Sequence, residues 1–390
     1  MINQEGKIMI YLDNAATSRI HPDALEKMNE IYNKFYGNPS SLHSFGHECE
    51  KILENSRERI ASFINATRSE IVFTSGGTES NTMAILGHLA SAYPGSQILT
   101  TRIEHPSVLE TLGHLPNKCL EVVFVKTDEY GNVDIEDLDQ KINDKTALTI
   151  FTHVNSELGS IQNLKKISDT IRHRKRDVRI HIDCVQSLGK IRIDAKEINA
   201  DTMSLSGHKV HGPRGIGGLF VNRATKIQPV FWGGHQEMGM RSGTEDLPSI
   251  AGFAVAIDIR KKMILHEFDR INNLKRMMVE MLLNGIENLR INSGEESSPY
   301  ILNISIRGIR GEILVHFLER DQIYISTGSA CSSKSASKNN VISRVLDDEG
   351  LVEGTIRISF GMFNSENEII QTAEKIIAYT KEIKKIARGR

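Results

Sequence analysis

The chain has 390 residues, more than one hydrophobic core usually organises, so two domains or one large layered domain are expected. Its 39% hydrophobic and 25% charged residues are ordinary for a globular protein, and 48 basic against 49 acidic side chains argue against direct binding to nucleic acid. No apolar run approaches the roughly 18 residues of a membrane span, and the amino terminus lacks a secretion signal, so a cytoplasmic location without a membrane partner is expected.

From about residue 70 onward, short β-rich runs alternate with helical patterns. This alternation predicts a mostly parallel α/β sheet with helices on its faces. The seven runs are EIVFT, QILTT, LEVVFV, ALTIFTHV, VRIHIDCV, DTMSLS and GGLFV. Polar residues follow five of these runs, in FTSGGTES, TTRIEHPS, THVNSELG, HIDCVQS and SLSGHKVHGPRG. Since ligands of such sheets bind at the carboxyl ends of the strands, these segments predict the site.

A long helical pattern over residues 248–284 follows the last of these strands. It leads into the strand-like run YILNISI, the helical GEILVHFLER, the strand-like QIYIST and TIRISF, and a closing helix that starts at Ser365. We therefore predict a large domain at residues 13–257 and a smaller α/β domain built from residues 1–12 and 258–390.

The stretch STGSACSSKSASKNN has almost no apolar content and predicts a mobile loop at about residues 326–340. It holds Cys331, and a thiol with nothing to bury it is a candidate for reaction. The other cysteines, Cys49, Cys119 and Cys184, lie in helical or strand-like patterns and are expected to be structural. With no C-x-x-C pair in the chain, no metal site and no disulfide framework are predicted.

Lys209 follows a strand and is flanked by a histidine and a glycine-rich turn. Taken alone it could be a surface charge, but a lysine of lowered pKa can form a Schiff base with an aldehyde cofactor. Pyridoxal phosphate needs such a lysine, a carboxylate at its ring nitrogen and a place for its phosphate. Asp183 ends an apolar strand, where burying a carboxylate is costly in free energy unless the carboxylate meets a cation such as a protonated ring nitrogen. The alternative role for Asp183 is to cap a helix.

The segment FTSGGTES passes from a strand through two glycines into a helix. Backbone amides and the Thr78 hydroxyl at a helix amino terminus suit a phosphate group. The segment has neither the lysine of a nucleotide-binding P-loop nor the spacing of a dinucleotide site, which argues against a nucleotide.

These segments together resemble a known family. The chain is similar to cysteine desulfurases of the class V aminotransferase group, which have the fold-type I architecture of pyridoxal-phosphate-dependent transferases with a seven-stranded sheet. The step of 26 positions from Cys331 to Arg357 resembles the group I branch with its long catalytic loop. The segments that carry the resemblance are YLDNAAT, GNPSSLHSFG, IVFTSGGTESNTMAI, HVNSELGSIQ, HIDCVQSLGK, SLSGHKVHGPRGIG, GMRSGTED, STGSACSS and TIRISFG.

The resemblance implies roles for individual residues. It implies pyridoxal phosphate bound covalently to Lys209, with Cys331 and His105 as further catalytic residues. The implied cofactor contacts are His105 stacked on the ring, Asp183 at the ring nitrogen, Gln186 and Asn155 near the ring hydroxyl, and Gly77, Thr78, Ser206 and His208 at the phosphate. Thr244 would reach the phosphate from a partner subunit, which implies a homodimer. The implied substrate contacts are Arg357, which would bind the substrate carboxylate, and Asn38 and Asn155.

The activity implied is conversion of L-cysteine to L-alanine with a persulfide on Cys331. The sulfur would pass to an acceptor protein, either an iron–sulfur scaffold or a transfer-RNA thiolation enzyme. Selenocysteine lyase or another class V enzyme is an alternative, and a catalytically silent sulfur carrier is a third. The chain departs from the family pattern at Cys184, His235 and Met238, none of which carries an implied catalytic role.

Overall fold

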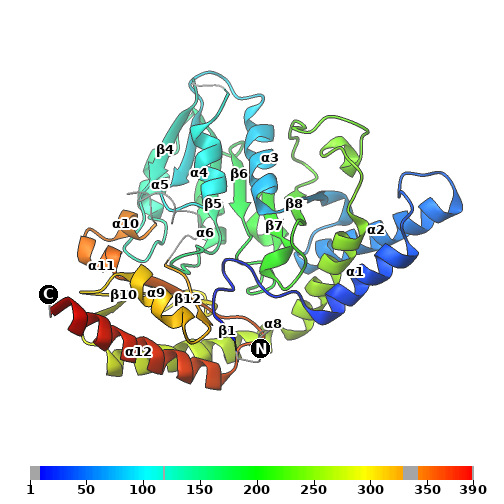
Figure 1. Ribbon diagram of the computed structural model, residues 1–390. Coiled ribbons are helices and arrows are strands. Elements are labelled where there is room, and N and C mark those ends of the chain that lie inside the picture. Colours follow the sequence, from blue (N-terminus) through cyan, green and yellow to red (C-terminus); the bar gives the residue numbers. More distant parts are fainter. Residues whose placement is uncertain (1–8, 117–118, 328–340, 389–390) are drawn as a thin grey trace.

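A seven-stranded sheet forms the centre of the larger part of this computed structural model, which describes residues 9–116, 119–327 and 341–388 (Figure 1). The strands lie in the order β2, β8, β7, β6, β5, β3, β4. Strand β8 is antiparallel to β2 and β7, and the other neighbouring pairs are parallel. The predicted sheet is confirmed, with strands β2 (Ile71–Thr74), β3 (Gln97–Thr101), β4 (Glu121–Val125), β5 (Thr146–Thr152), β6 (Arg179–Asp183), β7 (Thr202–Ser206) and β8 (Gly217–Val221).

Two glycines let the turn after β2 lie close to β8. A Cβ atom at Gly217 would stand 2.6 Å from the Cα atom of Gly76, closer than real Cβ contacts come. Gly76 itself has φ of 151°, in the region that favours glycine. The close approach fixes where helix α3 (Gly77–Leu89) begins, at the carboxyl end of β2.

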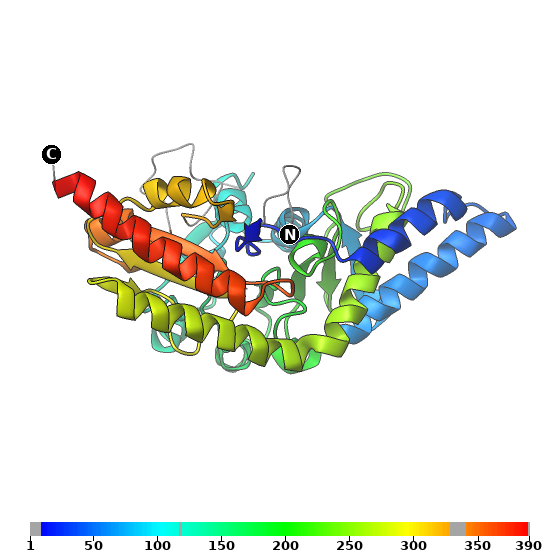
Figure 2. The same cartoon turned by 60° about the horizontal axis from the view of Figure 1, so that its bottom comes forward.

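Further helices surround the sheet. Both views show α1 (Pro22–Lys34) and α2 (Ser44–Phe63) extending together away from the sheet (Figures 1 and 2). Each of these two begins at a histidine whose side chain accepts a backbone N–H, His21 for α1 and His43 for α2. The other helices of this part are α4 (Pro106–Gly113), α5 (Ile135–Lys141), α6 (Leu164–Arg174) and α7 (Ala195–Ile198).

A second, antiparallel sheet has three strands in the order β12, β10, β9. These are β9 (Leu289–Ile291), β10 (Ile301–Ile306) and β12 (Thr355–Ser359), and β1 (Ile10–Tyr11) pairs separately with β11 (Ile323–Tyr324). The predicted run QIYIST is thus shorter than expected, and β9 was not expected. The helices of this part are α9 (Gly311–Glu319), α10 (Ile342–Val345), α11 (Glu349–Glu353) and α12 (Glu366–Arg388).

Helix α8 (Leu247–Gly285) joins the two parts and confirms the predicted helix at residues 248–284. Its first turns bury Phe253 and Ile257 in the core of the large sheet, whereas Ile271 and Met278 belong to the core of the second sheet. Figure 2 shows α12 lying alongside the later part of α8, which it contacts. The predicted domain boundary after residue 257 falls inside α8 and stays a prediction.

Every helix in the described part of the chain is too short or too polar to cross a membrane. Of the predicted loop at residues 326–340, positions 328–340 with Cys331 lie outside the described residues. Cys49 and Cys184 are buried, as expected for structural thiols, and burial raises the pKa of the Cys184 thiol. Cys119 is exposed, so the expectation that it is a structural thiol in strand-like apolar surroundings is wrong; the strand begins two residues later, at Glu121.

Candidate functional site

A cavity of about 330 Å³ lies at the carboxyl ends of strands β2, β3, β5, β6 and β7. This is the edge of the sheet at which the polar segments of the sequence predicted a site. Ten predicted residues line it: Gly77, Thr78, His105, Asn155, Asp183, Gln186, Ser206, His208, Lys209 and Arg357.

Lys209 lies in a single 3₁₀ turn, Gly207–Lys209, directly after β7. Its Nζ donates to the carbonyl oxygens of Ala15 at 2.5 Å and Ala16 at 2.8 Å, and both of these residues line the cavity. These two carbonyls hold the amine at the cavity wall, where an aldehyde bound in the cavity can reach it.

Asp183, the last residue of β6, is held by two hydrogen bonds. Its Oδ1 accepts from the backbone N–H of Val185 at 2.9 Å, and its Oδ2 accepts from Nδ2 of Asn81 at 2.8 Å. A buried carboxylate facing the cavity suits a protonated ring nitrogen better than the helix cap that the sequence left open.

Asn81 and His181, which orient Asp183, were not expected from the sequence. Burial lowers the pKa of His181 to about 3, so this imidazole is neutral and donates through one nitrogen only. Nε2 of His181 lies 2.9 Å from Oδ1 of Asn81, an acceptor, while Nδ1 lies 2.9 Å from the Thr202 hydroxyl. This pairing directs the amide hydrogens of Asn81 toward Asp183. The signal was present as two strongly polar residues, Asn81 and His181, inside otherwise apolar helix and strand patterns.

His105 caps helix α4, and this contact fixes its tautomer. Nδ1 accepts from the backbone N–H of Ser107 at 3.1 Å, so the proton of the neutral ring is on Nε2. Desolvation lowers the pKa of His105. The negative charge of Asp183 acts to raise this pKa, whereas the cation of Lys209 lowers it further. His105 lines the cavity and is exposed, so its ring offers a flat neutral surface to a cofactor ring.

The cavity also has an end that fits a phosphate. The hydroxyl oxygen of Ser206 is fully buried and has no hydrogen-bond partner among the described residues. The backbone N–H groups of the first turn of α3, at Gly77 and Thr78, precede the intrahelical bonds. A Cβ atom at Gly77 would stand 2.5 Å from Val185, so only glycine keeps this wall open. The Ser206 hydroxyl, the backbone N–H groups at the start of α3 and the space kept open at Gly77 together fit the phosphate of pyridoxal phosphate.

Two amide side chains that the resemblance assigns to the ring hydroxyl, those of Asn155 and Gln186, line the cavity. The Asn155 oxygen already accepts from the N–H groups of Glu157 and Leu158, both at 2.9 Å, and its Nδ2 donates to the carbonyl of Ile103. Only the second amide hydrogen of Asn155 remains for a ligand. Gln186 donates from Nε2 to the Ala15 carbonyl at 2.8 Å.

Arg357 comes from β12 in the second sheet. Its Nη2 donates to Oδ1 of Asp13 at 2.8 Å and its Nη1 to the carbonyl of Ser156 at 3.0 Å. Its buried Nε lacks a partner among residues 9–116, 119–327 and 341–388. A guanidinium with spare donors in a cavity wall is suited to a carboxylate ligand. Asp13, which orients Arg357, was not expected from the sequence.

Glu104 is a second unexpected residue of the cavity wall. Burial, together with the negative charge of Asp183, raises the pKa of Glu104 to about 7, although the neighbouring Thr152 and Thr101 act to lower it. The unfolded chain would ionise Glu104 near pH 4.5, so native stability is lost as pH rises from there through 7. Glu104→Gln is therefore expected to stabilise the protein above pH 7 by up to about 3 kcal/mol, with little effect near pH 4.5.

Urea unfolding without added pyridoxal phosphate, at pH 5 and pH 8, measures this difference. The matched control is Glu110→Gln, a nearby exposed carboxylate on α4, which is expected to change stability equally little at both pH values. Equal effects of Glu104→Gln at the two pH values would contradict the prediction.

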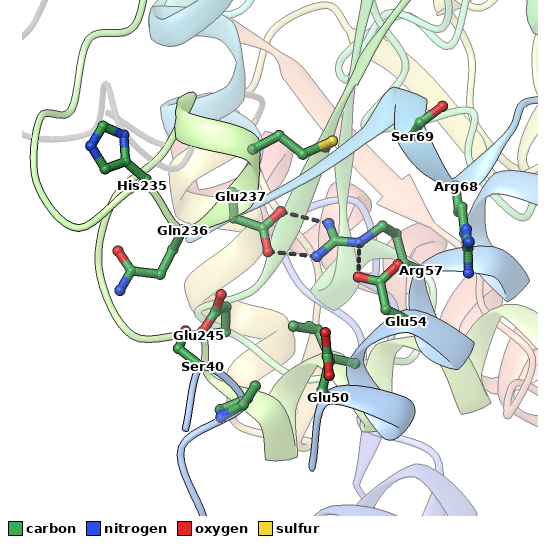
Figure 3. Close-up of a pocket in the computed structure, with 13 residues that line it drawn as sticks. Ser40, Glu50, Glu54, Arg57, Arg68, Ser69, His235, Gln236, Glu237 and Glu245 are labelled. Atoms are coloured by element: carbon green, nitrogen blue, oxygen red, sulfur yellow. Dashed lines mark hydrogen bonds and ion pairs between the residues drawn. The ribbon is translucent and has the colours of Figure 1, made fainter. Parts of the chain in front are cut away.

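Two predicted residues, Asn38 and Thr244, are exposed and are not among the residues that line this cavity. They lie next in sequence to residues that line a second hollow of about 540 Å³, shown in Figure 3, namely Pro39 and Glu245. Cys331, the remaining predicted residue, lies outside the described residues.

A buried ion pair anchors one side of this second hollow (Figure 3). Arg57 of α2 donates from Nη1 and Nη2 to the two carboxylate oxygens of Glu237 at 2.6 and 2.8 Å. Glu237 also accepts from the backbone N–H of Phe73 in β2 at 2.7 Å. The turn that precedes Thr244 is therefore fixed to the large sheet, since both oxygens of Glu237 are satisfied inside the protein.

Comparisons with known proteins agree with this geometry. A family model described as aminotransferase class-V matches residues 10–371. The chain is 35% identical over 367 residues to the cysteine desulfurase IscS 1 of Archaeoglobus fulgidus, covering 94% of this chain and 95% of that one. A solved NifS-like protein superimposes with a TM-score of 0.90 at 32% identity, over 96% of this chain and 100% of its own.

A second solved structure, described as SspA in complex with cysteine, has a TM-score of 0.80 at 30% identity and covers 91% of this chain and 100% of its own. The similarity thus extends over nearly the whole chain, including every strand that contributes to the cavity. The fold and family expected from the sequence are confirmed. The chain belongs to the aminotransferase class-V family, among its pyridoxal-phosphate-dependent cysteine desulfurases.

Proposed function

We propose that the protein is a cysteine desulfurase that uses pyridoxal phosphate to convert L-cysteine to L-alanine and transfers the sulfur onward from Cys331. The observation that carries the proposal is the cavity itself. It combines a lysine held by backbone carbonyls, a carboxylate fixed by two hydrogen bonds, an unpartnered serine hydroxyl near the start of α3 and an arginine whose Nε has no partner among the described residues.

Pyridoxal phosphate, when bound, supplies an aldehyde for an amine and a ring that accepts electrons from the substrate. Asp183, oriented by Asn81 and the backbone of Val185, would face the protonated ring nitrogen. His105 would lie against the ring, and Ser206 with the first turn of α3 would bind the phosphate. Together these side chains would set the ring's depth and orientation in the cavity.

Arg357 would bind the substrate carboxylate. Its guanidinium stays oriented by Asp13 and the Ser156 carbonyl, and a carboxylate that meets the unused donors would hold the substrate Cα near Lys209. The amine of Lys209 would then remove the Cα proton as a general base. For this it must leave the carbonyls of Ala15 and Ala16, which are neutral acceptors.

Cys331 would take the sulfur as a thiolate. Its sulfur attacks the substrate sulfur, so that an S–S bond forms and the C–S bond of the substrate breaks. The bonding electrons remain with the substrate carbon, which takes up a proton to become alanine. The product on the protein is a persulfide, which can pass its outer sulfur to the thiolate of an acceptor.

The described residues on both sides of the cysteine segment support this role. Ser326 pairs with Arg357 through two backbone hydrogen bonds of 3.0 and 2.7 Å, and Val341 lines the cavity. The four peptide links from Thr327 to Cys331 span at most about 14 Å. The chain therefore enters and leaves the segment beside the proposed substrate site.

The decisive experiment is incubation of the cofactor-loaded protein with L-cysteine. Alanine should form, and the peptide that contains Cys331 should gain the mass of one sulfur atom. Pyruvate or an amino-group transfer without added sulfur would indicate another class V activity. Preference for selenocysteine, measured side by side, would indicate a selenocysteine lyase.

We further propose a homodimer in which Thr244 reaches the phosphate of the partner subunit's cofactor. Thr244 is exposed and follows a turn fixed by Arg57 and Glu237, so it can project from its own chain in a defined position. Light scattering in solution tests the dimer. An iron–sulfur scaffold or a transfer-RNA thiolation enzyme as acceptor, and the cytoplasmic location, stay predictions from the sequence.

A further inference from the structure

Lys190 is a buried lysine that the reaction described above does not use. It ends the turn that follows β6, and only 6% of its surface is exposed. Its Nζ donates to Oε1 of Gln186 at 2.9 Å. Gln186 lines the cavity, so Lys190 touches a cavity residue from the side that faces the protein interior.

The Gln186 amide is held at both ends. While Oε1 accepts from Lys190, Nε2 donates to the carbonyl of Ala15, which lines the cavity and also accepts from Lys209. Turning the amide by 180° would set its NH₂ group against the amine of Lys190 and its oxygen against a carbonyl. Two donors would then face each other at Lys190, and two acceptors would face each other at Ala15. Lys190 therefore determines which end of the amide faces the cavity.

The surroundings of Lys190 make its burial costly. The nearby charges that act on it are the cations of Lys209, Arg260 and Arg357 and the carboxylate of Glu267. Desolvation is the largest influence and lowers the pKa of Lys190 well below that of an exposed lysine. A buried amine beside three cations is expensive to keep, and an apolar residue of similar length would avoid that cost.

The neighbourhood of Lys190 is nevertheless rigid. Nε of Arg260, from helix α8, donates to the carbonyl of Gly189 at 2.6 Å, and its Nη1 donates to Glu267 at 2.5 Å. Nη2 of Arg260 bonds the Tyr300 hydroxyl at 3.0 Å, and the Tyr300 ring lies 5.9 Å from the amine of Lys190. The turn is thus anchored to α8 independently of Lys190, which leaves Lys190 free for a task at Gln186.

We propose that Lys190 is a positioning residue for the cofactor, which acts by fixing the Gln186 amide with its NH₂ group toward the ring hydroxyl. The inference rests on the proposed function for the identity of the cofactor, but not on the desulfuration step. The proposed role of Lys190 affects the affinity for the cofactor and the electronic state of the bound cofactor ring. It therefore remains testable by cofactor binding alone.

The first test compares Lys190→Met, which keeps the length and loses the donor, with the wild type. Titration with pyridoxal phosphate is expected to show that the dissociation constant of the Lys190→Met protein is raised about 5- to 10-fold. This is the change expected from the loss of one oriented hydrogen bond. The visible absorption and circular dichroism of the bound cofactor are expected to shift. The matched control is Lys275→Met, which removes a buried amine of α8 that donates to Ser297 and Ser298. This variant should change neither the dissociation constant nor the spectrum of the cofactor.

The double variant with Gln186→Ala separates positioning from structure. If Lys190 acts through Gln186, Lys190→Met changes neither affinity nor spectrum further in the Gln186→Ala background. An undiminished effect in that background, or a wild-type spectrum and affinity for Lys190→Met, would overturn the proposal.

Gln186→Glu covers the case in which Lys190→Met does not fold. This variant keeps an acceptor for Lys190 but has no NH₂ group, and the proposal expects it to lose cofactor affinity and shift the spectrum. Unchanged affinity and spectrum would refute the role of the amide direction. Cofactor binding that behaves as expected without alanine formation from cysteine would instead count against the proposed function.

Discussion

Lys209→Ala is expected to slow alanine formation from L-cysteine by about 1,000-fold or more, because it removes both the covalent attachment of the cofactor and the general base. The Nζ atom donates to the backbone carbonyls of Ala15 and Ala16, and these neutral acceptors can be hydrated when the amine is removed. The fold should therefore survive the change.

The rate is measured as the alanine released per molecule of cofactor-loaded protein. Covalent attachment of the cofactor is measured by reduction with borohydride followed by mass spectrometry of the peptides. The variant should carry no reduced cofactor at position 209. Lys226→Ala, at an exposed lysine after β8, is the control and should retain wild-type values. Covalent labelling that persists in Lys209→Ala would assign the cofactor to another amine.

Cys331→Ser should keep pyridoxal phosphate bound with an unchanged visible spectrum, yet lose the persulfide and slow alanine formation by more than about 100-fold. The hydroxyl of serine is a poor nucleophile toward sulfur, whereas a thiolate is a strong one. Binding should be unaffected because the cofactor contacts described above come from other segments.

Cys119→Ser is the matched control, since Cys119 is the exposed cysteine of the described part of the chain. It should form the persulfide at the wild-type rate. The measurement is the mass of the tryptic peptides after incubation with cysteine, together with alanine release. Wild-type alanine release from Cys331→Ser would remove Cys331 from the reaction.

The seven strands of the large sheet could be predicted from the sequence pattern, as could Lys209, Asp183 and the turn with Thr78 at its edge, whereas the other predicted residues of the cavity were expected from the resemblance. Each strand is a short β-rich run, and in a parallel sheet the residues after such runs must meet at one edge. The three-residue β9, only half-buried along its length, has no comparable pattern.

The residues that support the cavity were not predictable because their effect depends on pairing between distant segments. Asn81 and Asp183 are 102 positions apart, and Arg357 and Asp13 are 344 apart. Nothing in the local sequence of Lys190 or Glu104 indicates whether each side chain faces water or is buried in the protein. Asn38 and Thr244 were expected at the site by resemblance alone, and within the described part of one chain they lie beside the second hollow instead.

Helix α8 has a consequence for how the molecule unfolds. Phe253 and Ile257 at one end and Ile271 and Met278 at the other place a single hydrogen-bonded segment in two separate cores. Loss of either core removes the packing that keeps its half of the helix folded, and an isolated helical remnant gains little from its own backbone bonds. The two cores are therefore coupled into one cooperative unit, and the backbone amides of α8 should exchange with solvent only through global opening.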